Sequence, residues 1–280
     1  MAIERLGIVG SGIMGSGIAE VAAKAGVAVV LRSRKQESAD AMVAALGRSL
    51  ARQVDRGKLD EADATAITGR VSATADLEAL ADCDLVLESV VEDLGVKRQL
   101  FAELDRIVKD GAILATNTST LADETGRPER VCGIHFFNPA PAMSLVEIIR
   151  TLVSSDETIA DATAFAEACG KGPVVVEDRA GFIVNALLFP YLNNAVRMLE
   201  NRTASRDDID SAMKGGCNFP MGPLALLDLV GLDTSVAILD ALYAEFSDPN
   251  YAAVPLLRRM VVAGHLGRKS GQGFYDYRKK

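Results

Sequence analysis

The 280-residue sequence has only two histidines, four cysteines and fewer basic than acidic residues, and each shortage excludes a class of protein. The cysteines are far apart and form no Cys-x-x-Cys pair, which argues against a disulfide framework or a bound metal and fits reduced thiols. The net charge of −8 argues against binding to duplex nucleic acid, which requires a basic face. No apolar run approaches the ~20 residues needed to cross a bilayer.

The rest of the composition is that of an ordinary globular protein, since 49% of the residues are hydrophobic and 24% are charged. The sequence begins with the apolar strand pattern Ile3-Glu-Arg-Leu-Gly-Ile-Val9, so we expect no signal peptide. We therefore expect a cytoplasmic protein that binds a small molecule and neither a membrane nor nucleic acid.

The first 180 residues alternate between short apolar strands and helical patterns. This alternation predicts a Rossmann-type, doubly wound α/β sheet with a parallel core. Strands are predicted at 6–9, 27–31, 84–88, 112–115, 131–136, 145–149 and 173–176, and helices at 13–25, 37–56, 94–108 and 157–169.

The pattern becomes helical after Gly181, with predicted helices at 182–200, 206–213, 224–246 and 254–263 and one strand at the terminal Gly-Phe-Tyr-Asp-Tyr277. We therefore predict a dinucleotide-binding domain at 1–180 and an all-α substrate and dimerisation domain at 181–280. The segment Leu224-Ala-Leu-Leu-Asp-Leu-Val230 is more hydrophobic than a small monomer's surface, which predicts a homodimer formed through this domain.

A glycine loop lies between the first predicted strand and the first predicted helix. Its first glycine permits the tight turn, the second lets the backbone approach a pyrophosphate, and the third lets helix and strand pack closely. The helix N-terminus then offers free amides to the phosphates. The predicted dinucleotide-binding residues of this loop are Gly10, Ser11, Gly12, Ile13, Met14 and Gly15.

The end of the second predicted strand lacks the acid that usually holds both ribose hydroxyls of NAD. Ser33 stands there, within Arg32-Ser-Arg-Lys35. A serine does not repel a 2′-phosphate, and Arg34 or its basic neighbours could pair with one. We therefore predict NADP(H) in preference to NAD(H). The alternative is that these charges form an ordinary solvated loop and the protein uses NAD.

His135 lies at the end of a predicted strand and precedes Glu147 by twelve residues. Histidine exchanges a proton near neutral pH, and a buried carboxylate that touches the ring would orient it as a general base. The alternative is a hydrogen-bonded core histidine. The second histidine, His265, has no acid nearby in the sequence and fits a surface or turn position.

Several further motifs accompany the glycine loop. With them, the sequence resembles the L-3-hydroxyacyl-CoA dehydrogenase family along essentially its whole length, and most closely its bacterial 3-hydroxybutyryl-CoA dehydrogenases. The motifs are Asn117-Thr-Ser119, His135-Phe-Phe-Asn-Pro-Ala-Pro141, Gly181-Phe-Ile-Val-Asn185, Pro220-Met-Gly-Pro-Leu224 and Gly267-Arg-Lys-Ser-Gly-Gln-Gly-Phe-Tyr275.

The resemblance implies hydride transfer between a nicotinamide cofactor and a CoA thioester, with interconversion of a 3-hydroxyacyl-CoA and a 3-ketoacyl-CoA. It implies that His135 is the catalytic base and Glu147 its orienting carboxylate. Ser119 would hydrogen-bond the substrate's 3-oxygen, and Asn185 would polarise that oxygen or place the acyl group.

The resemblance also implies binding residues. Ser119 belongs to the substrate contacts as well, and the family's positions for the CoA nucleotide match Ser49 and Arg56, which share one helical face with Arg52 nearby. An ordinary amphipathic surface is the alternative there. Positions that contact the cofactor's ribose, phosphate or nicotinamide match Glu92, Lys97, Asn138 and Lys269.

The sequence departs from the family pattern at two places, which limits how far the family's properties can be assigned to it. Ser33 replaces the ribose-binding acid, and the stretch between Ser119 and His135 is about five residues shorter than usual, which leaves the acyl chain length open. A dehydrogenase of a free hydroxy or sugar acid, such as L-gulonate, would share the base but not the CoA-facing helix. A non-catalytic, crystallin-like relative would be expected to lose the base or its partner.

Overall fold

The computed structural model describes residues 2–10, 12–90, 93–116 and 124–278. Contacts within the chain divide it into two compact units, Met1–Asp178 and Arg179–Lys280. Each unit has its own hydrophobic core. None of the helices among the described residues is long and apolar enough to cross a membrane.

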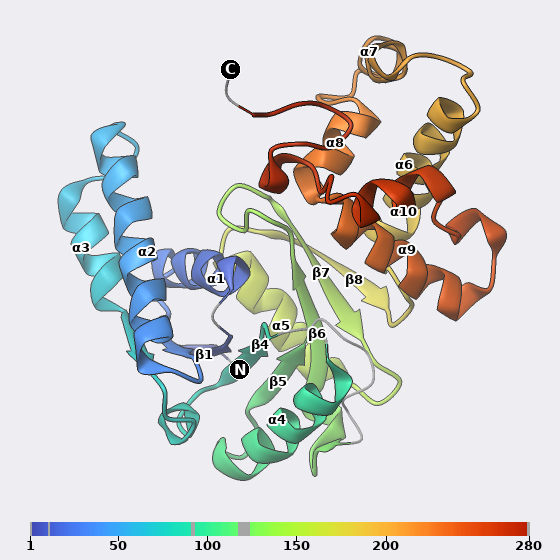
Figure 1. Ribbon diagram of the computed structural model, residues 1–280. Helices are drawn as coiled ribbons and strands as arrows, with labels where there is room; N and C mark the ends of the chain where they lie inside the picture. Colours follow the sequence, from blue (N-terminus) through green and yellow to red (C-terminus); the bar gives the residue numbers. More distant parts are fainter. Residues whose placement is uncertain (1, 11, 91–92, 117–123, 279–280) are drawn as a thin grey trace. The chain divides into compact units, whose positions relative to one another are not determined.

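The first unit is built on one eight-stranded sheet (Figure 1), with the strand order β3-β2-β1-β4-β5-β6-β7-β8. All neighbouring strands are parallel except β6 and β7, which are antiparallel. The predicted doubly wound sheet with a parallel core is therefore confirmed. The strands are β1 (Arg5–Val9), β2 (Ala28–Arg32), β3 (Val71–Thr74), β4 (Leu85–Glu88), β5 (Ile113–Thr116), β6 (Val131–Phe136), β7 (Leu145–Arg150) and β8 (Gly172–Glu177).

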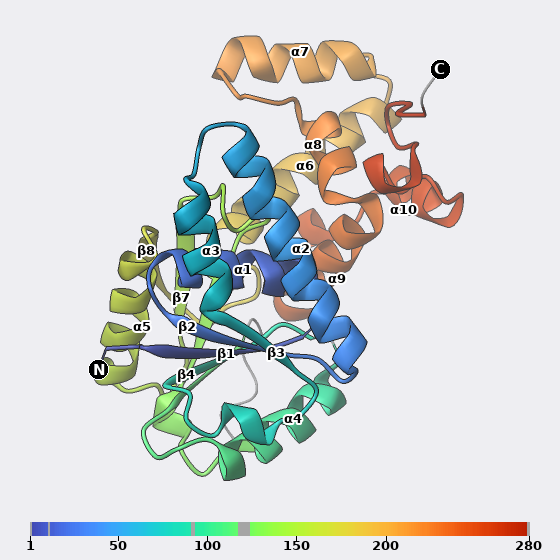
Figure 2. The same cartoon turned by 90° about the vertical axis from the view of Figure 1, so that its left-hand side faces the viewer.

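Helices cover both faces of the sheet because successive strand residues point to opposite sides. Leu6 and Ile8 of β1 belong to the core beneath α1, α2, α3 and α5, whereas Val9 belongs to the core beneath α4. Figure 2 shows α4 on one side of the sheet and α1, α2 and α3 on the other. These helices are α1 (Ile13–Lys24), α2 (Gln36–Asp55), α3 (Glu61–Gly69), α4 (Leu94–Ile107) and α5 (Asp156–Ala168).

Two elements of this unit, β3 and α3, were not predicted from the sequence. The edge strand β3 has the sequence VSAT, in which only Val71 is buried, so it lacks the apolar run of its neighbours. The helix α3 is similar, because Ile67 is its one buried residue. β3 packs against β2 and α2, and α3 packs against α2. These contacts stabilise two elements whose own hydrophobic patterns are weak.

The second unit packs its helices around a core that includes Phe189, Leu192, Leu227, Leu239 and Leu257. The predicted helix at 224–246 is two helices, because the chain breaks at Gly231, whose φ of 103° suits only glycine. The helices are α6 (Val184–Glu200), α7 (Arg206–Cys217), α8 (Pro223–Val230), α9 (Leu232–Phe246) and α10 (Pro255–Val262).

The predicted strand at the C-terminus is wrong, since this segment forms only isolated bridges. The backbone amides of Phe274 and Tyr275 each donate to the carboxylate of Asp228, at 2.8 Å, instead of to a neighbouring strand. Asp228 is buried, and burial raises the pKa of its carboxyl. A buried side chain on α8 thus takes the place of a sheet partner.

Candidate active site

Gly10, Gly12 and Gly15 lie where β1 ends and α1 begins. Gly10 has a φ of 139°, and a Cβ added there would collide with the carbonyl oxygen of Ser89. A Cβ added to Gly15 would lie 3.4 Å from Cγ2 of Ile8 on β1 and 3.0 Å from Cε of Met42 on α2, so α1 packs closely against both the sheet and the next helix. At Gly12, the residue before α1, an added Cβ would meet nothing within 4 Å.

The open space at Gly12 belongs to a cavity of about 540 Å³. The glycine loop, the end of β2 and the helix α4 line it, and Gln99 and Glu103 contribute from α4. No sequence pattern indicated these two residues, because they do not belong to a motif. Free amides at the start of α1 and the space in front of them fit the phosphates of a dinucleotide.

The end of β2 contributes Arg32, Ser33 and Arg34 to the same cavity. Ser33 is buried and its backbone amide donates to the carbonyl of Thr74 at 3.1 Å, which fixes its position beside β3. Nε of Arg32 donates to the carbonyl of Ala75 at 3.3 Å, whereas Arg34 is exposed. The end of β2 and the two residues after it therefore contribute a serine and two arginines, and no carboxylate, to the lining of the cavity.

His135 and Glu147 are directly opposite each other on the antiparallel strands β6 and β7. Nδ1 of His135 lies 2.7 Å from Oε2 of Glu147. The Glu147 side chain is 1% exposed and that of His135 is 18% exposed, so the imidazole is the member of the pair that solvent reaches. The ring of Phe137 packs against the imidazole with the two ring centroids 4.6 Å apart. If Nδ1 donates to the carboxylate, Nε2 is the nitrogen that can exchange a proton.

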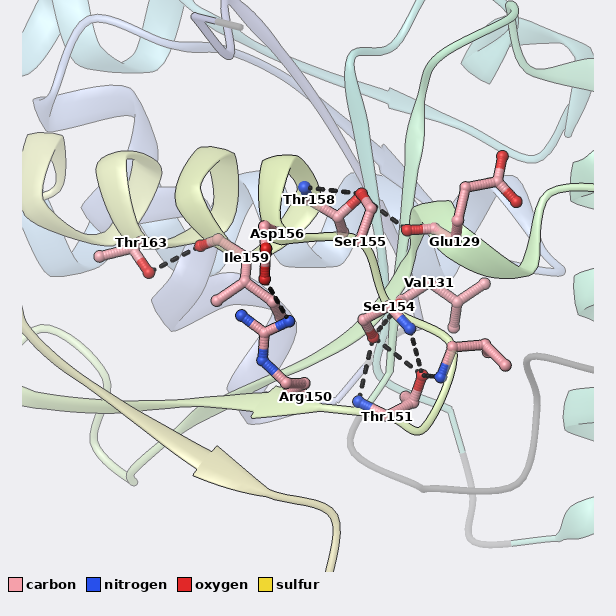
Figure 3. A network of polar contacts seen from close by, with 11 residues as sticks. Glu129, Val131, Arg150, Thr151, Ser154, Ser155, Asp156, Thr158, Ile159 and Thr163 are labelled. Carbon is pink, nitrogen blue, oxygen red and sulfur yellow. Dashed lines mark hydrogen bonds and ion pairs between the residues drawn. The ribbon is translucent and has the colours of Figure 1, made fainter.

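Hydrogen bonds of Ser154 hold the two strands together at the ends that lie far from the His135–Glu147 pair. Oγ of Ser154 donates to the carbonyl of Val131, the first residue of β6, at 2.6 Å. The backbone amide of Thr151, just after β7, donates to Oγ of Ser154 at 3.0 Å. Figure 3 shows this network, which also holds the start of α5, since Oγ1 of Thr158 donates to the carbonyl of Glu129 at 2.8 Å.

Lys97, predicted as a cofactor contact, lies inside the fold. Its Nζ is 3.2 Å from Oε2 of Glu88, and both side chains are almost fully buried. Oγ1 of Thr116 donates to the same carboxylate at 2.9 Å, and the backbone amide of Val90 donates to its other oxygen at 2.6 Å. Glu88 ends β4. It was not among the predicted site residues, although an acid at the end of a buried strand is a usable signal.

The predicted CoA-binding residues lie on and just after α2. Ser49 donates from Oγ to Oε2 of Glu20 on α1 at 2.9 Å. Burial alone would raise the pKa of Glu20, but hydrogen bonds from Lys24, Gln53 and Ser49 outweigh it and hold this pKa below its usual value. Ser49 is thus part of a contact between helices, whereas the predicted phosphate-binding residues Arg52 and Arg56 are exposed.

The remaining predicted residues are distributed as follows. Asn138 is exposed, two residues after the end of β6, and Met14 packs its side chain against the core of the first unit. In the second unit Asn185 lies in the first turn of α6, and Nζ of Lys269 lies 2.6 Å from Oδ1 of Asp233. His265 is half-buried and follows the turn at residues 263–264 after α10. Ile13 begins α1, and the predicted site residues outside the described part of the chain are Ser11, Glu92 and Ser119.

Comparison with known families matches two adjoining models to this chain. Residues 5–179 match the model described as "3-hydroxyacyl-CoA dehydrogenase, NAD binding domain". Residues 181–277 match the model described as "3-hydroxyacyl-CoA dehydrogenase, C-terminal domain". Both matches confirm the resemblance inferred from the motifs.

Individual relatives agree with the family models. The chain is 50% identical to a 3-hydroxybutyryl-CoA dehydrogenase of Mycobacterium tuberculosis, with 99% of each chain covered. It is 46% identical to a 3-hydroxybutyryl-CoA dehydrogenase of Clostridioides difficile, over 98% of this chain and 100% of the relative. The crystal structure of (S)-3-hydroxybutyryl-CoA dehydrogenase from Ralstonia eutropha superposes with a TM-score of 0.95 at 42% identity, covering 99% of this chain and 100% of that one.

Proposed function

Since the chain belongs to the 3-hydroxyacyl-CoA dehydrogenase family, we propose that it interconverts (S)-3-hydroxybutyryl-CoA and acetoacetyl-CoA with a nicotinamide dinucleotide. The observation that carries the proposal is the contact between Nδ1 of His135 and the buried carboxylate of Glu147. An imidazole held in this way near the end of a strand, and partly exposed to solvent, is suited to exchange a proton with an alcohol.

His135 performs the proton transfer in this mechanism. In the oxidative direction, Nε2 takes the proton of the 3-hydroxyl group as the carbon–oxygen double bond forms. The bound nicotinamide supplies the hydride acceptor in this direction and the hydride donor in the other. Glu147 stabilises the imidazolium that forms, and its burial strengthens this interaction because few waters compete. In reduction the imidazolium returns the proton to the oxygen.

Ser119 and Asn185 are proposed to stabilise the substrate's 3-oxygen by hydrogen bonding as its charge changes. This assignment rests on the family motifs Asn117-Thr-Ser119 and Gly181-Phe-Ile-Val-Asn185. Exposed Arg52 and Arg56 are proposed to bind the CoA phosphates, with Ser49 beside them on α2. Asn138, Glu92 and Lys269 remain proposed cofactor contacts on the same basis, and Lys97 is proposed to act through its ion pair with Glu88.

We propose NADP(H) as the preferred cofactor over NAD(H). The support is the absence of a carboxylate on β2 at the cavity, together with the hydroxyl of Ser33 and the cationic side chains of Arg32 and Arg34. Arg34 forms no hydrogen bond or ion pair with other described residues, so its guanidinium is available to a 2′-phosphate.

The direct test is to measure kcat/KM for NADPH and for NADH with acetoacetyl-CoA and with a longer 3-ketoacyl-CoA. We expect turnover of acetoacetyl-CoA with a preference for NADPH. A clear preference for NADH would contradict the cofactor assignment alone. Reduction of NADP or NAD by L-gulonate, without turnover of the CoA thioesters, would contradict the substrate assignment and favour a free hydroxy acid.

We also propose a cytoplasmic homodimer formed through the second unit. Large apolar side chains are exposed on this unit, with Leu187 of α6 71% exposed and Leu229 of α8 49% exposed. Exposed apolar groups of this size favour burial in an interface. All four cysteines are free, as expected in a reducing compartment. Sedimentation at micromolar concentration tests the assembly, and a monomer there would contradict it.

A further inference from the structure

The loop of residues 137–144 connects the strands that carry His135 and Glu147 (Figure 1). The far ends of these strands are held by the hydrogen bonds of Ser154. At the near end, the shape of the loop sets how the two strands approach each other. Inside the loop, the backbone amides of Ala142 and Met143 both donate to the carbonyl of Pro139, at 3.0 and 3.2 Å. Other carbonyls of the loop accept hydrogen bonds from residues outside the loop.

Lys171 supplies such a partner. Its Nζ donates to the carbonyl of Ala140 and to the carbonyl of Met143, both at 2.7 Å. A lysine ammonium is a compact charge with three donors, so it can bridge two carbonyls that converge on it. Burial lowers the pKa of Lys171, as is expected for an ammonium drawn from water toward main-chain oxygens.

The main chain beside Lys171 holds the same loop. Lys171 lies between α5 and β8, and its own amide donates to the carbonyl of Ala166 in α5 at 3.0 Å. The amide of Gly172 donates to the carbonyl of Ser144, the last residue of the loop, at 2.7 Å. The ammonium therefore extends from a backbone that is itself fixed against both the helix and the loop.

The opposite side of the loop packs on the dinucleotide-binding helix α1. A Cβ added to Gly17 of α1 would lie 3.3 Å from Cβ of Ala140 and 3.3 Å from Cδ of Pro141. Ala140 is 2% exposed. The loop is thus confined between an apolar contact on α1 and the ammonium of Lys171, and movement away from either side loses contacts.

We infer that Lys171 is a positioning residue for the acid–base pair: by bridging Ala140 and Met143 it sets the loop that aligns His135 with Glu147. The inference rests on the proposed function for its link to turnover. Its geometric part concerns only the His135–Glu147 contact and does not depend on which substrate the enzyme takes.

The test compares Lys171→Met, which keeps the aliphatic stem but removes the donors, with Lys171→Arg, which restores donors. Nuclear magnetic resonance of protein labelled with 15N-histidine reports the Nδ1–Glu147 hydrogen bond directly. The chain has only two histidines, so His265 serves as an internal reference. Lys109→Met is the matched control, because Lys109 pairs with Asp84 away from this loop.

In Lys171→Met we expect the His135 ring resonances to shift while those of His265 stay in place. We also expect kcat with acetoacetyl-CoA to fall about tenfold or more, with KM for the cofactor within about twofold, since a small misalignment of a catalytic group slows turnover strongly. Lys171→Arg should recover part of both effects, and Lys109→Met should show neither.

Unchanged His135 resonances in folded Lys171→Met would overturn the inference, whatever happens to activity or thermal stability. A wild-type protein that does not turn over acetoacetyl-CoA would contradict the proposed function. In that case the resonance comparison still decides whether Lys171 positions the pair, so the two failures are distinguishable.

Discussion

His135 and Glu147 are directly opposite each other on neighbouring antiparallel strands, and this register places Nδ1 of one 2.7 Å from Oε2 of the other. Side chains that face each other across a strand pair are separated by only about 5 Å at Cβ, so a histidine and a glutamate there meet without unusual rotamers. Strand pairing thus places the two side chains of the proposed pair opposite each other, and the loop that joins the strands completes their alignment.

Removal of the base should abolish most of the activity. In His135→Gln we expect kcat to fall about a hundredfold or more, because general acid–base groups contribute on the order of 10²–10⁴. Steady-state reduction of acetoacetyl-CoA measures the loss. His265→Gln is the control and should retain wild-type kcat, and equal losses in both variants would point to folding and not to catalysis.

Glu147→Gln should slow turnover without weakening cofactor binding. An amide of similar size fills the buried site but no longer stabilises the imidazolium, so kcat should drop about tenfold or more. Cofactor affinity, measured by fluorescence titration of the reduced dinucleotide, should stay within about twofold. A variant with wild-type kcat would remove Glu147 from the mechanism.

Ser33→Asp should reverse the cofactor preference. The new carboxylate would repel a 2′-phosphate and accept hydrogen bonds from the ribose hydroxyls of NAD. We expect kcat/KM for NADPH to fall at least about tenfold relative to that for NADH, from the loss of about 1.4 kcal/mol or more of binding. Thr65→Asp, which adds the same charge at an exposed site on α3, should not change the ratio.

Arg52→Ala combined with Arg56→Ala should weaken CoA binding specifically. A charged hydrogen bond to phosphate contributes about 1.5–3 kcal/mol, so KM for acetoacetyl-CoA should rise about tenfold or more. Acetoacetyl-pantetheine lacks the nucleotide and provides the comparison, since its KM should be the same in both proteins. An equal rise for both substrates would mean that the helix, and not a phosphate contact, was perturbed.

Asp84→Asn should destabilise the first unit at neutral pH. Asp84 accepts hydrogen bonds from the amides of Glu4 and Arg5, both at 2.8 Å, and from Nζ of Lys109 at 2.6 Å. Burial alone would raise its pKa, but these donors outweigh burial and lower the pKa below its usual 3.8. We expect a loss of about 1–3 kcal/mol in the free energy of unfolding at pH 7.

The sign of the pH dependence follows from that lowered pKa. A carboxyl whose pKa is lower in the folded state stabilises the fold above the unfolded-state pKa, and the contribution is lost as pH falls through the folded-state value. The difference in the free energy of unfolding between wild type and Asp84→Asn should therefore become smaller below about pH 4. Urea unfolding at several pH values measures it, and Asp82→Asn, an exposed neighbour, should show no such narrowing.

Much of the fold was predictable because its signals are local. The buried strands β1, β2, β4 and β5 are short apolar runs bounded by polar or glycine residues, and hydrophobic periodicity identifies such strands directly. β3 and α3 were missed because each buries only one large apolar side chain, so their stability comes from their neighbours. The helix break at Gly231 depends on a positive φ, which a continuous apolar pattern does not reveal.

The candidate residues of the site could be selected from the sequence, because glycine spacing and the scarcity of histidine are properties of the chain itself. Its geometry depends on residues that are distant along the chain. Ser49 contacts Glu20, Lys97 pairs with buried Glu88, and Lys171 bridges the loop between the catalytic strands, none of which a sequence pattern indicates. Hydrogen bonds and burial depend on three-dimensional proximity, so the roles of these side chains emerge only when the strands and helices have packed together.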